Sequence, residues 1–318
     1  MTEARTVGLP RALLYHKYHT LWTTFFEELG WRTVISGPTT RGTLERGVGL
    51  AVDESCLPMK VFLGHVDSLR DHCDVVFIPR LESLTPDEHL CVKFMGVYDI
   101  VRNTMPDLAV IGYDVDAANA VHERSSMIAL ARQLGAGRLA SRRAYDRALT
   151  AQRAHERELA RLQESLLETG GPHPDRIRIL VVGHTYNLAD ELIGKPIITY
   201  LESLGVEVIT SDAIDKPLAR KLSARLSPGI RWTYNKELLG AVELYRDVVD
   251  GIVFIVTFPC GPDSLMGELC QRKLHGVPVA TIVLDELQAE AGLRTRLESF
   301  VDIIAAKRHA RQRCEVGS

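Results

Sequence analysis

Short runs of residues that are apolar throughout alternate with helical segments along most of this chain, and this alternation constrains the fold more than any other feature. The clearest runs are RILVVG at 178–183 and GIVFIVTF at 251–258. Strands of this kind are typical of a parallel sheet that is covered by helices on both faces. The repeated order of strand and helix therefore predicts an α/β protein.

The alternation stops once, in the middle of the chain. Residues 117–172 are rich in Ala, Leu, Arg and Glu and contain no strand-like run, which predicts helices, one of them long and highly charged. The sequence TGGPHP at 169–174 combines glycines with prolines and marks a boundary. We expect two Rossmann-like or flavodoxin-like domains, 1–116 and 173–318, joined by the helical segment 117–172.

Charge and hydropathy exclude several classes of protein. The chain has 38 basic and 41 acidic residues, a net charge of −3, so it lacks the basic excess that favours nucleic acid or an anionic membrane. Its N-terminus MTEARTVGLP does not resemble a signal peptide, and its apolar runs are far shorter than the ~20 residues of a membrane span. We expect a cytoplasmic protein that binds neither nucleic acid nor membrane.

The cysteines are the most informative candidates for chemistry. There are six of them: Cys56, Cys73, Cys91, Cys260, Cys270 and Cys314. A disulfide framework belongs to small secreted domains, and without a CxxC pair a zinc ribbon or a thioredoxin motif is disfavoured. Metal ligation, a reactive thiol and burial in the core remain open.

Three cysteines occupy positions where a ligand of a parallel α/β protein is expected. Cys260 follows the run GIVFIVTF and precedes a helix that we expect to begin near Asp263 and Ser264, an N-cap pair. Cys91 follows the run VVFIPR, and Cys56 stands just before a helical segment. Ligands bind outside the carboxyl ends of parallel strands, and a helix N-terminus favours the metal-binding thiolate. The three could share one site, although burial remains the alternative for each.

The other candidates carry less information. Cys73 enters an apolar strand and Cys270 lies within a helix, which favours the core, whereas Cys314 lies in a polar tail and is expected to be exposed. Neither a P-loop nor a GxGxxG fingerprint is present. His184, after the run RILVVG, is a ligand or a base, or simply a hydrogen-bond partner of nearby backbone.

Seven segments carry a resemblance that extends over nearly the whole chain: GLPRALLYHKYHTLWTTFFEELG, VDESCLPMKVFLGHV, VVFIPRLESL, CVKFMGVYDIVRN, VGHTYNLADELI, TFPCGPDSLMGELC and LDELQAEAGLRTRLESFVDII. Together they resemble the acyl-CoA dehydratase activase-related proteins, which are relatives of the iron–sulfur subunits of 2-hydroxyacyl-CoA dehydratases and of double-cubane cluster proteins. The motifs DESCLP and CGPDS are its most specific parts.

The resemblance implies a four-iron, four-sulfur cluster in a cleft between two Rossmann-like domains. Carried onto this sequence, its three ligands are Cys56, Cys91 and Cys260, with a non-protein ligand at the fourth iron, and the helix start at Asp263 and Ser264 supplies hydrogen bonds to the cluster. Family members usually have CPK at the second cysteine, where this chain has CVK, and a DEH-type run where this chain has LDELQ. The second difference argues against a catalytic role at the position of Leu287.

The function implied by the resemblance is low-potential electron transfer or reduction in anaerobic metabolism. The expected partners are a separate ATP-hydrolysing activator, a small acyl-CoA or other small molecule at the open iron, and a second subunit in a homodimer or heterodimer. Whether the chain itself turns over stays open, because the dehydratases use two different subunits. The alternatives are a scaffold or regulatory component of the same system, and a cluster-free ligand-binding protein with structural cysteines.

Overall fold

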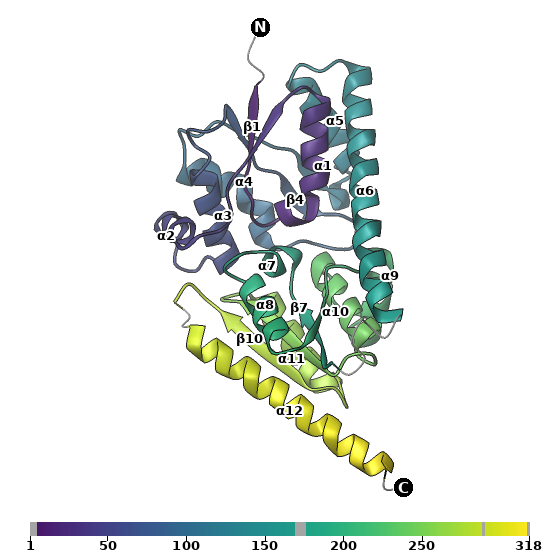
Figure 1. Ribbon diagram of the computed structural model, residues 1–318. Coiled ribbons are helices and arrows are strands. Elements are labelled where there is room, and N and C mark those ends of the chain that lie inside the picture. The colour runs from purple at the N-terminus through teal and green to yellow at the C-terminus, as the bar shows by residue number, and fades with distance from the viewer. Residues whose placement is uncertain (1–4, 169–175, 288–289, 317–318) are drawn as a thin grey trace. The chain divides into compact units, whose positions relative to one another are not determined.

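The computed structural model describes residues 5–168, 176–287 and 290–316, and the chain divides into two compact units. Unit 1 comprises Met1–Glu158 together with Arg231–Tyr234, and unit 2 comprises Leu159–Ile230 together with Asn235–Ser318. Figure 1 labels the elements of both units. The helical segment expected at 117–172 is divided between them, because residues 117–158 belong to unit 1 and residues 159–172 to unit 2.

Unit 1 is built on a four-stranded parallel sheet of order β2-β1-β3-β5, beside which β4 and β6 form a parallel pair. Its strands are β1 (Thr6–Leu9), β2 (Arg32–Ile35), β3 (Val75–Phe77), β4 (Arg80–Ser83), β5 (Val110–Ile111) and β6 (Asp114–Asp116). Its helices are α1 (Tyr15–Glu28), α2 (Arg41–Leu50), α3 (Leu57–Asp67), α4 (Val92–Thr104), η1 (Ala117–Asn119), α5 (Glu123–Gln133) and most of α6 (Arg138–Glu168).

Aromatic side chains fill the core of unit 1 between the sheet and α1. Trp22 and Phe26 of α1 each meet Phe77 of β3 edge to face, at ring distances of 5.2 and 5.0 Å. On its other side α1 runs beside α6 (Figure 1), and the Gln152 side chain accepts a hydrogen bond from the Leu21 amide. Burial of these large rings stabilises the unit and fixes α1 against the sheet.

Helices α2 and α3 of unit 1 approach each other closely through two glycines. A Cβ atom added to Gly47 would lie 1.7 Å from the carbonyl oxygen of Lys60, and one added to Gly64 would lie 1.9 Å from that of Thr43. Neither contact is compatible with a side chain, so both positions require glycine for packing reasons. This crossing fixes α3, whose N-terminus follows Cys56.

Unit 2 has a four-stranded parallel sheet of order β10-β9-β7-β8. Its strands are β7 (Arg178–Val182), β8 (Glu207–Thr210), β9 (Gly251–Thr257) and β10 (Val279–Leu284). Its helices are the end of α6, α7 (Thr185–Leu188), α8 (Lys195–Ser203), α9 (Lys216–Leu226), most of α10 (Thr233–Tyr245), α11 (Gly261–Lys273) and α12 (Glu290–Val316). Every residue of β9 is buried, as the uninterrupted apolar run predicts.

The structure confirms the predicted fold class, two parallel α/β units of flavodoxin-like strand order. It corrects one detail. Helix α11 begins at Gly261, so Cys260 occupies the N-cap position that Asp263 and Ser264 were expected to fill. No helix in the described parts of the chain is long and apolar enough to cross a membrane.

Candidate functional site

The strand order of unit 2 places its switch point between β7 and β9. The chain continues from β7 to β8, which pairs with one edge of β7, whereas β9 pairs with the other edge of β7. The loops that leave such neighbouring strands diverge and create the place where parallel α/β proteins bind ligands. In unit 2 the two residues that follow these strands and begin the next helices are His184 and Cys260.

The three cysteines singled out in the sequence share one local position, because each is the N-cap residue of a helix. Cys56 precedes α3, Cys91 precedes α4 and Cys260 precedes α11, all with extended backbone and half-buried side chains. A helix N-terminus carries free N–H groups and a partial positive charge, which favour a thiolate and donate hydrogen bonds to sulfur. The N-cap position thus suits all three for metal ligation.

Asp263 lies in the first turn of α11, but its side chain points into the unit instead of capping the helix. It is 4% exposed, and its Oδ1 atom accepts hydrogen bonds from His184 Nε2 at 2.9 Å and from Asn235 Nδ2 at 2.8 Å. The Cys260 side chain also hydrogen-bonds to this carboxyl group. Ser264, by contrast, is exposed and donates to the Cys260 carbonyl oxygen at 2.8 Å.

The buried carboxyl group of Asp263 is kept in its charged form by these partners. Burial alone raises the pKa of a carboxyl group, but the charge of His184 and the hydrogen bonds from His184, Asn235 and Cys260 outweigh it, so the pKa of Asp263 lies below its ordinary value. The sequence analysis considered His184 as a candidate. It missed Asn235, because it predicted no helix where α10 lies.

Unit 1 contributes Cys56 and Cys91 at the ends of two helices, α3 and α4, that contact each other. Lys60, in the first turns of α3, is 4% exposed. In the same helix, His65 forms hydrogen bonds with the hydroxyl groups of Ser36 and Thr39, both at 2.9 Å.

Each unit holds part of the predicted ligand set, since two of the cysteines belong to unit 1 and the third to unit 2. Within the described part of the chain, no three His, Cys, Asp or Glu side chains form a group that could hold a metal ion. The donor chemistry fits an iron–sulfur cluster, because thiolates are its ligands and each sulfur adjoins a helix N-terminus. The shared site itself stays a prediction.

The remaining cysteines differ from these three. Cys270 of α11 is fully buried, and burial raises the pKa of its thiol to about 12. Cys73 is half-buried, donates a hydrogen bond to the Leu69 carbonyl oxygen at 3.3 Å, and has a pKa raised mainly by burial. The side chain of Cys314 lies outside the described residues. Neither Cys73 nor Cys270 precedes a helix.

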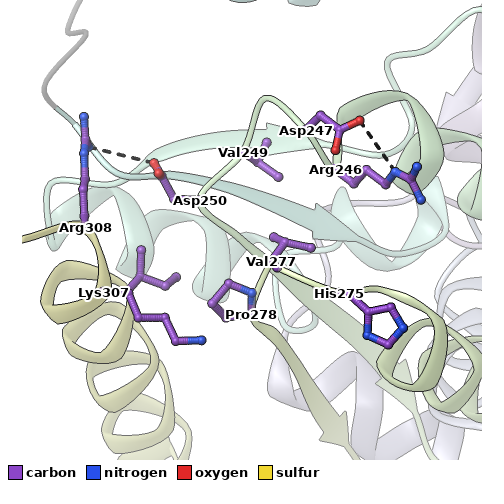
Figure 2. A pocket seen from close by; sticks show the side chains of 11 residues that line it. Arg246, Asp247, Val249, Asp250, His275, Val277, Pro278, Lys307 and Arg308 are labelled. Atoms are coloured by element: carbon purple, nitrogen blue, oxygen red, sulfur yellow. Dashed lines mark ion pairs between the residues drawn. The ribbon is translucent and has the colours of Figure 1, made fainter. Parts of the chain in front are cut away.

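Three cavities compete with these positions as candidate sites, and none of them is lined by any of the three cysteines. In unit 2 a cavity of about 390 Å³ lies between α8 and α12. In unit 2 a second cavity, of about 260 Å³, lies where β9 and β10 begin, lined by Asp250 and Pro278 among others (Figure 2). Cys260 follows the other end of β9. Two of the cations that line it are paired with acids, since Arg308 lies 3.9 Å from Asp250 and Arg246 lies 3.7 Å from Asp247. In unit 1 the space beyond β1 and β3 is walled by aromatic rings and holds about 20 Å³, room for one water molecule.

Comparison with known proteins gives one family. Residues 6–214 match the family model described as the CoA enzyme activase uncharacterised domain. No curated protein matches the chain. Two solved structures are similar over most of their length, but at low TM-scores. The crystal structure of ZnuA is 12% identical, covering 96% of this chain and 99% of that chain, with a TM-score of 0.26. The siderophore periplasmic binding protein from the fuscachelin gene cluster of Thermobifida fusca is 13% identical, covering 95% and 96%, with a TM-score of 0.25.

Proposed function

The chain belongs to the CoA enzyme activase uncharacterised domain family, whose model covers residues 6–214, and from this premise we propose that it is an iron–sulfur protein of a CoA-dependent enzyme system. In this proposal it is a relative of the 2-hydroxyacyl-CoA dehydratase subunits, serves low-potential electron transfer or reduction, and receives its electron from an ATP-hydrolysing activator. A dehydratase-type enzyme or an acyl-CoA is its partner.

One observation carries the proposal: the three cysteines that the family resemblance selects are also the three that occupy helix N-caps. Cys56, Cys91 and Cys260 would hold a four-iron, four-sulfur cluster. When bound, this group supplies a one-electron redox centre with one iron open to an external ligand.

The chain's own residues have separate roles toward such a cluster. The N-termini of α3, α4 and α11 stabilise negative charge on the three sulfurs. Lys60 is buried in α3, the helix that Cys56 begins, and Asp263, whose carboxylate accepts hydrogen bonds from His184 and Asn235, lies in the first turn of the helix that Cys260 begins. Net charge and hydrogen bonds to sulfur set a cluster's reduction potential, so these groups would tune it.

The test is the metal content of protein handled without oxygen. After anaerobic reconstitution we expect iron and sulfide in about equal amounts and an EPR signal on reduction. Replacing Cys56, Cys91 or Cys260 by Ser should abolish or strongly reduce iron uptake. The matched control is Cys270→Ala, which removes a buried thiol of the same helix that Cys260 begins, and should retain iron. Wild-type protein without iron, or a control that loses as much as Cys260→Ser, would refute the proposal.

A second candidate function follows from the family description, which names an activase. In that case the chain is a regulatory or scaffolding component of the activating system and reacts with no acyl-CoA itself. Titration of the reconstituted protein with acyl-CoAs separates the two candidates: a change in the cluster absorption favours the redox role, whereas an unchanged spectrum favours the scaffold. ATP hydrolysis by the purified chain would instead identify the activator itself.

A further inference from the structure

Strand β10 forms one outer edge of the unit 2 sheet, and within the described residues no other strand pairs with that edge. Amide groups of β9 and of the residue that follows it donate hydrogen bonds to the carbonyl oxygens of Pro278 and Leu284, at 2.9 and 2.8 Å. Successive residues of a strand direct their backbone groups to alternate sides, so every second residue from Pro278 to Leu284 faces β9. The N–H and C=O groups of Val279, Thr281 and Val283 therefore point away from the sheet.

The opposite edge of the same sheet, at β8, is closed by a side chain. Gln163, in the part of α6 that belongs to unit 2, accepts a hydrogen bond from the Thr210 amide at 3.2 Å and donates one to the Thr210 carbonyl oxygen at 3.0 Å. β8 also carries a charged residue, Glu207, which is paired with Arg178. Proteins protect exposed strand edges with covering groups, charges or prolines. The β10 strand, VATIVL, contains neither a charge nor a proline, so its edge is suited to pairing.

Helices α11 and α12 pack on the faces of the sheet and leave the β10 edge accessible. A Cβ added to Gly251 of β9 would lie 2.4 Å from Ile304 of α12. The Thr281 hydroxyl accepts a hydrogen bond from Gln271 of α11 at 3.0 Å. By the register of the two strands, Gly251 and Thr281 point to opposite faces of the sheet. Val283 is 44% exposed, so a second strand can approach β10 in the plane of the sheet.

We infer that the edge of β10 is a self-association surface, at which two copies of this chain pair their β10 strands antiparallel about a two-fold axis. The inference is independent of the proposed function, because it uses no cluster. In the register that pairs the outward-facing groups, Thr281 lies opposite Thr281 of the second copy, and Val279 lies opposite Val283 of the second copy. About six backbone hydrogen bonds then join the two sheets into one.

The side chains and charges of β10 suit a second copy as the occupant. The strand is uncharged, so no like charges meet, and the register sets Val against Val and Thr against Thr on one face, which are favourable cross-strand pairs. Lys307 and His275 lie around the start of the strand (Figure 2), whereas Asp285 and Glu286 directly follow its end. Antiparallel pairing brings the basic start of one β10 beside the acidic end of the other, which is complementary in charge.

Sedimentation velocity of the full chain over a range of concentrations tests the association. We expect wild type to form a species of twice the 35.4 kDa of the chain. Val283→Lys places a charge against Val279 of the second copy and should raise the dissociation constant about 10-fold. The matched control is Ile303→Lys in α12, which changes an apolar residue that is 52% exposed and should leave the dissociation constant unchanged.

Two further variants test the backbone pairing and its register. Thr281→Pro removes an outward N–H group without touching the bonds to β9, and should weaken the dimer at least about 10-fold. Thr281→Cys should form a disulfide between copies on mild oxidation, because directly opposite Cα atoms of a hydrogen-bonded pair lie about 5.5 Å apart. In Val283→Cys the two sulfur-bearing residues would be roughly 14 Å apart and should not join. Wild type, oxidised in parallel, controls for the native cysteines.

The inference is overturned if wild type stays monomeric at all concentrations, including the case in which β10 binds a strand of another protein instead. It is also overturned if folded Val283→Lys dimerises as wild type does, or if Ile303→Lys weakens the dimer as much. Cross-linking of Val283→Cys as readily as of Thr281→Cys would contradict the antiparallel register. If Thr281→Pro fails to fold, Val283→Lys and Thr281→Cys still decide the question.

Discussion

Replacing Gly47 by Ala should separate helices α2 and α3 and destabilise unit 1. The added Cβ would lie 1.7 Å from the carbonyl oxygen of Lys60, whereas real Cβ contacts are essentially never shorter than 3.0 Å. The helices must therefore move apart by at least 3.0 − 1.7 = 1.3 Å at this point. Backbone atoms cannot swing aside as a flexible side chain can, so the whole crossing has to adjust.

Two opposing effects decide the size of the change. Alanine stabilises a helix relative to glycine by about 1 kcal/mol. Overpacking a tight contact costs about 1–3 kcal/mol, and a backbone obstacle places this case at the upper end of that range. We expect Gly47→Ala to lower the free energy of unfolding of unit 1 by about 2 kcal/mol.

Helix α2 also provides a matched control. Gly49 lies two residues further along the same helix, and a Cβ added there would meet no atom within 4 Å. Gly49→Ala therefore keeps the helix-propensity gain without the clash and should stabilise the unit by up to about 1 kcal/mol. The two alanine variants should then differ by about 3 kcal/mol in opposite directions from wild type.

Tryptophan fluorescence during urea unfolding is the assay of choice, because all three tryptophans, Trp22, Trp31 and Trp232, belong to unit 1. The signal consequently reports the unfolding of this unit. A Gly47→Ala midpoint equal to or above that of Gly49→Ala would refute the close-approach argument. We also expect Gly47→Ala to take up less iron, since α3 carries Cys56 at its N-terminus.

Two further predictions concern unit 1. The backbone amide and the hydroxyl group of Thr6 donate hydrogen bonds to the Asp74 carboxylate at 2.6 and 2.9 Å, and these bonds hold the pKa of Asp74 below its ordinary value. The stability that the charged Asp74 contributes is therefore present above pH ~4 and is lost as pH falls through the lowered pKa. Asp74→Asn should hence lower the urea midpoint at pH 7 but much less at pH 3, and an equal loss at both would contradict this. Val92→Pro should raise the free energy of unfolding by about 0.4–1 kcal/mol and so raise the urea midpoint. Val92 is 70% exposed at the first position of α4, and Cys91 already has φ −63° and ψ 142°, which suit a residue before proline. A lower midpoint would show that the Val92 amide is needed.

The sequence predicted β7 and β9 of unit 2 well because these two strands are almost entirely apolar and buried. The sequence analysis assigned no element to helices α9 and α10. For α9 a local signal was present, since Asp215 caps the helix and Pro217 lies in its first turn, whereas α10 contains a glycine. Gly240 lies inside α10, where glycine normally weakens a helix, yet a Cβ at this position would lie 2.0 Å from the carbonyl oxygen of Ala219 in α9. Gly240 permits close packing of α10 against α9, and the residues around Gly240 do not indicate which helix packs there.

The start of the helix near Asp263 was predicted too far along the chain, and the neighbouring residues explain why. Aspartate is a favoured N-cap residue, which led to a helix start at Asp263. Proline is favoured in the first turn, however, and Pro262 belongs to that turn, so α11 begins at Gly261 and Cys260 becomes the N-cap. The aspartate then falls within the first turn, where its side chain reaches His184 and Asn235 instead of the helix end.

The helix starts at the three cysteines differ in sequence but not in geometry. Proline lies in the first turn after Cys56 and Cys260, whereas Cys91 is followed by Val and Lys. The chain nevertheless adopts extended backbone at Cys91 and begins α4 at the next residue. Proline therefore reinforces this N-cap without being required for it. The three positions share a cysteine with extended backbone that is followed directly by a helix. A sulfur ligand at any of them therefore depends on where the helix begins, and a substitution that shifts the first helical residue would test this dependence.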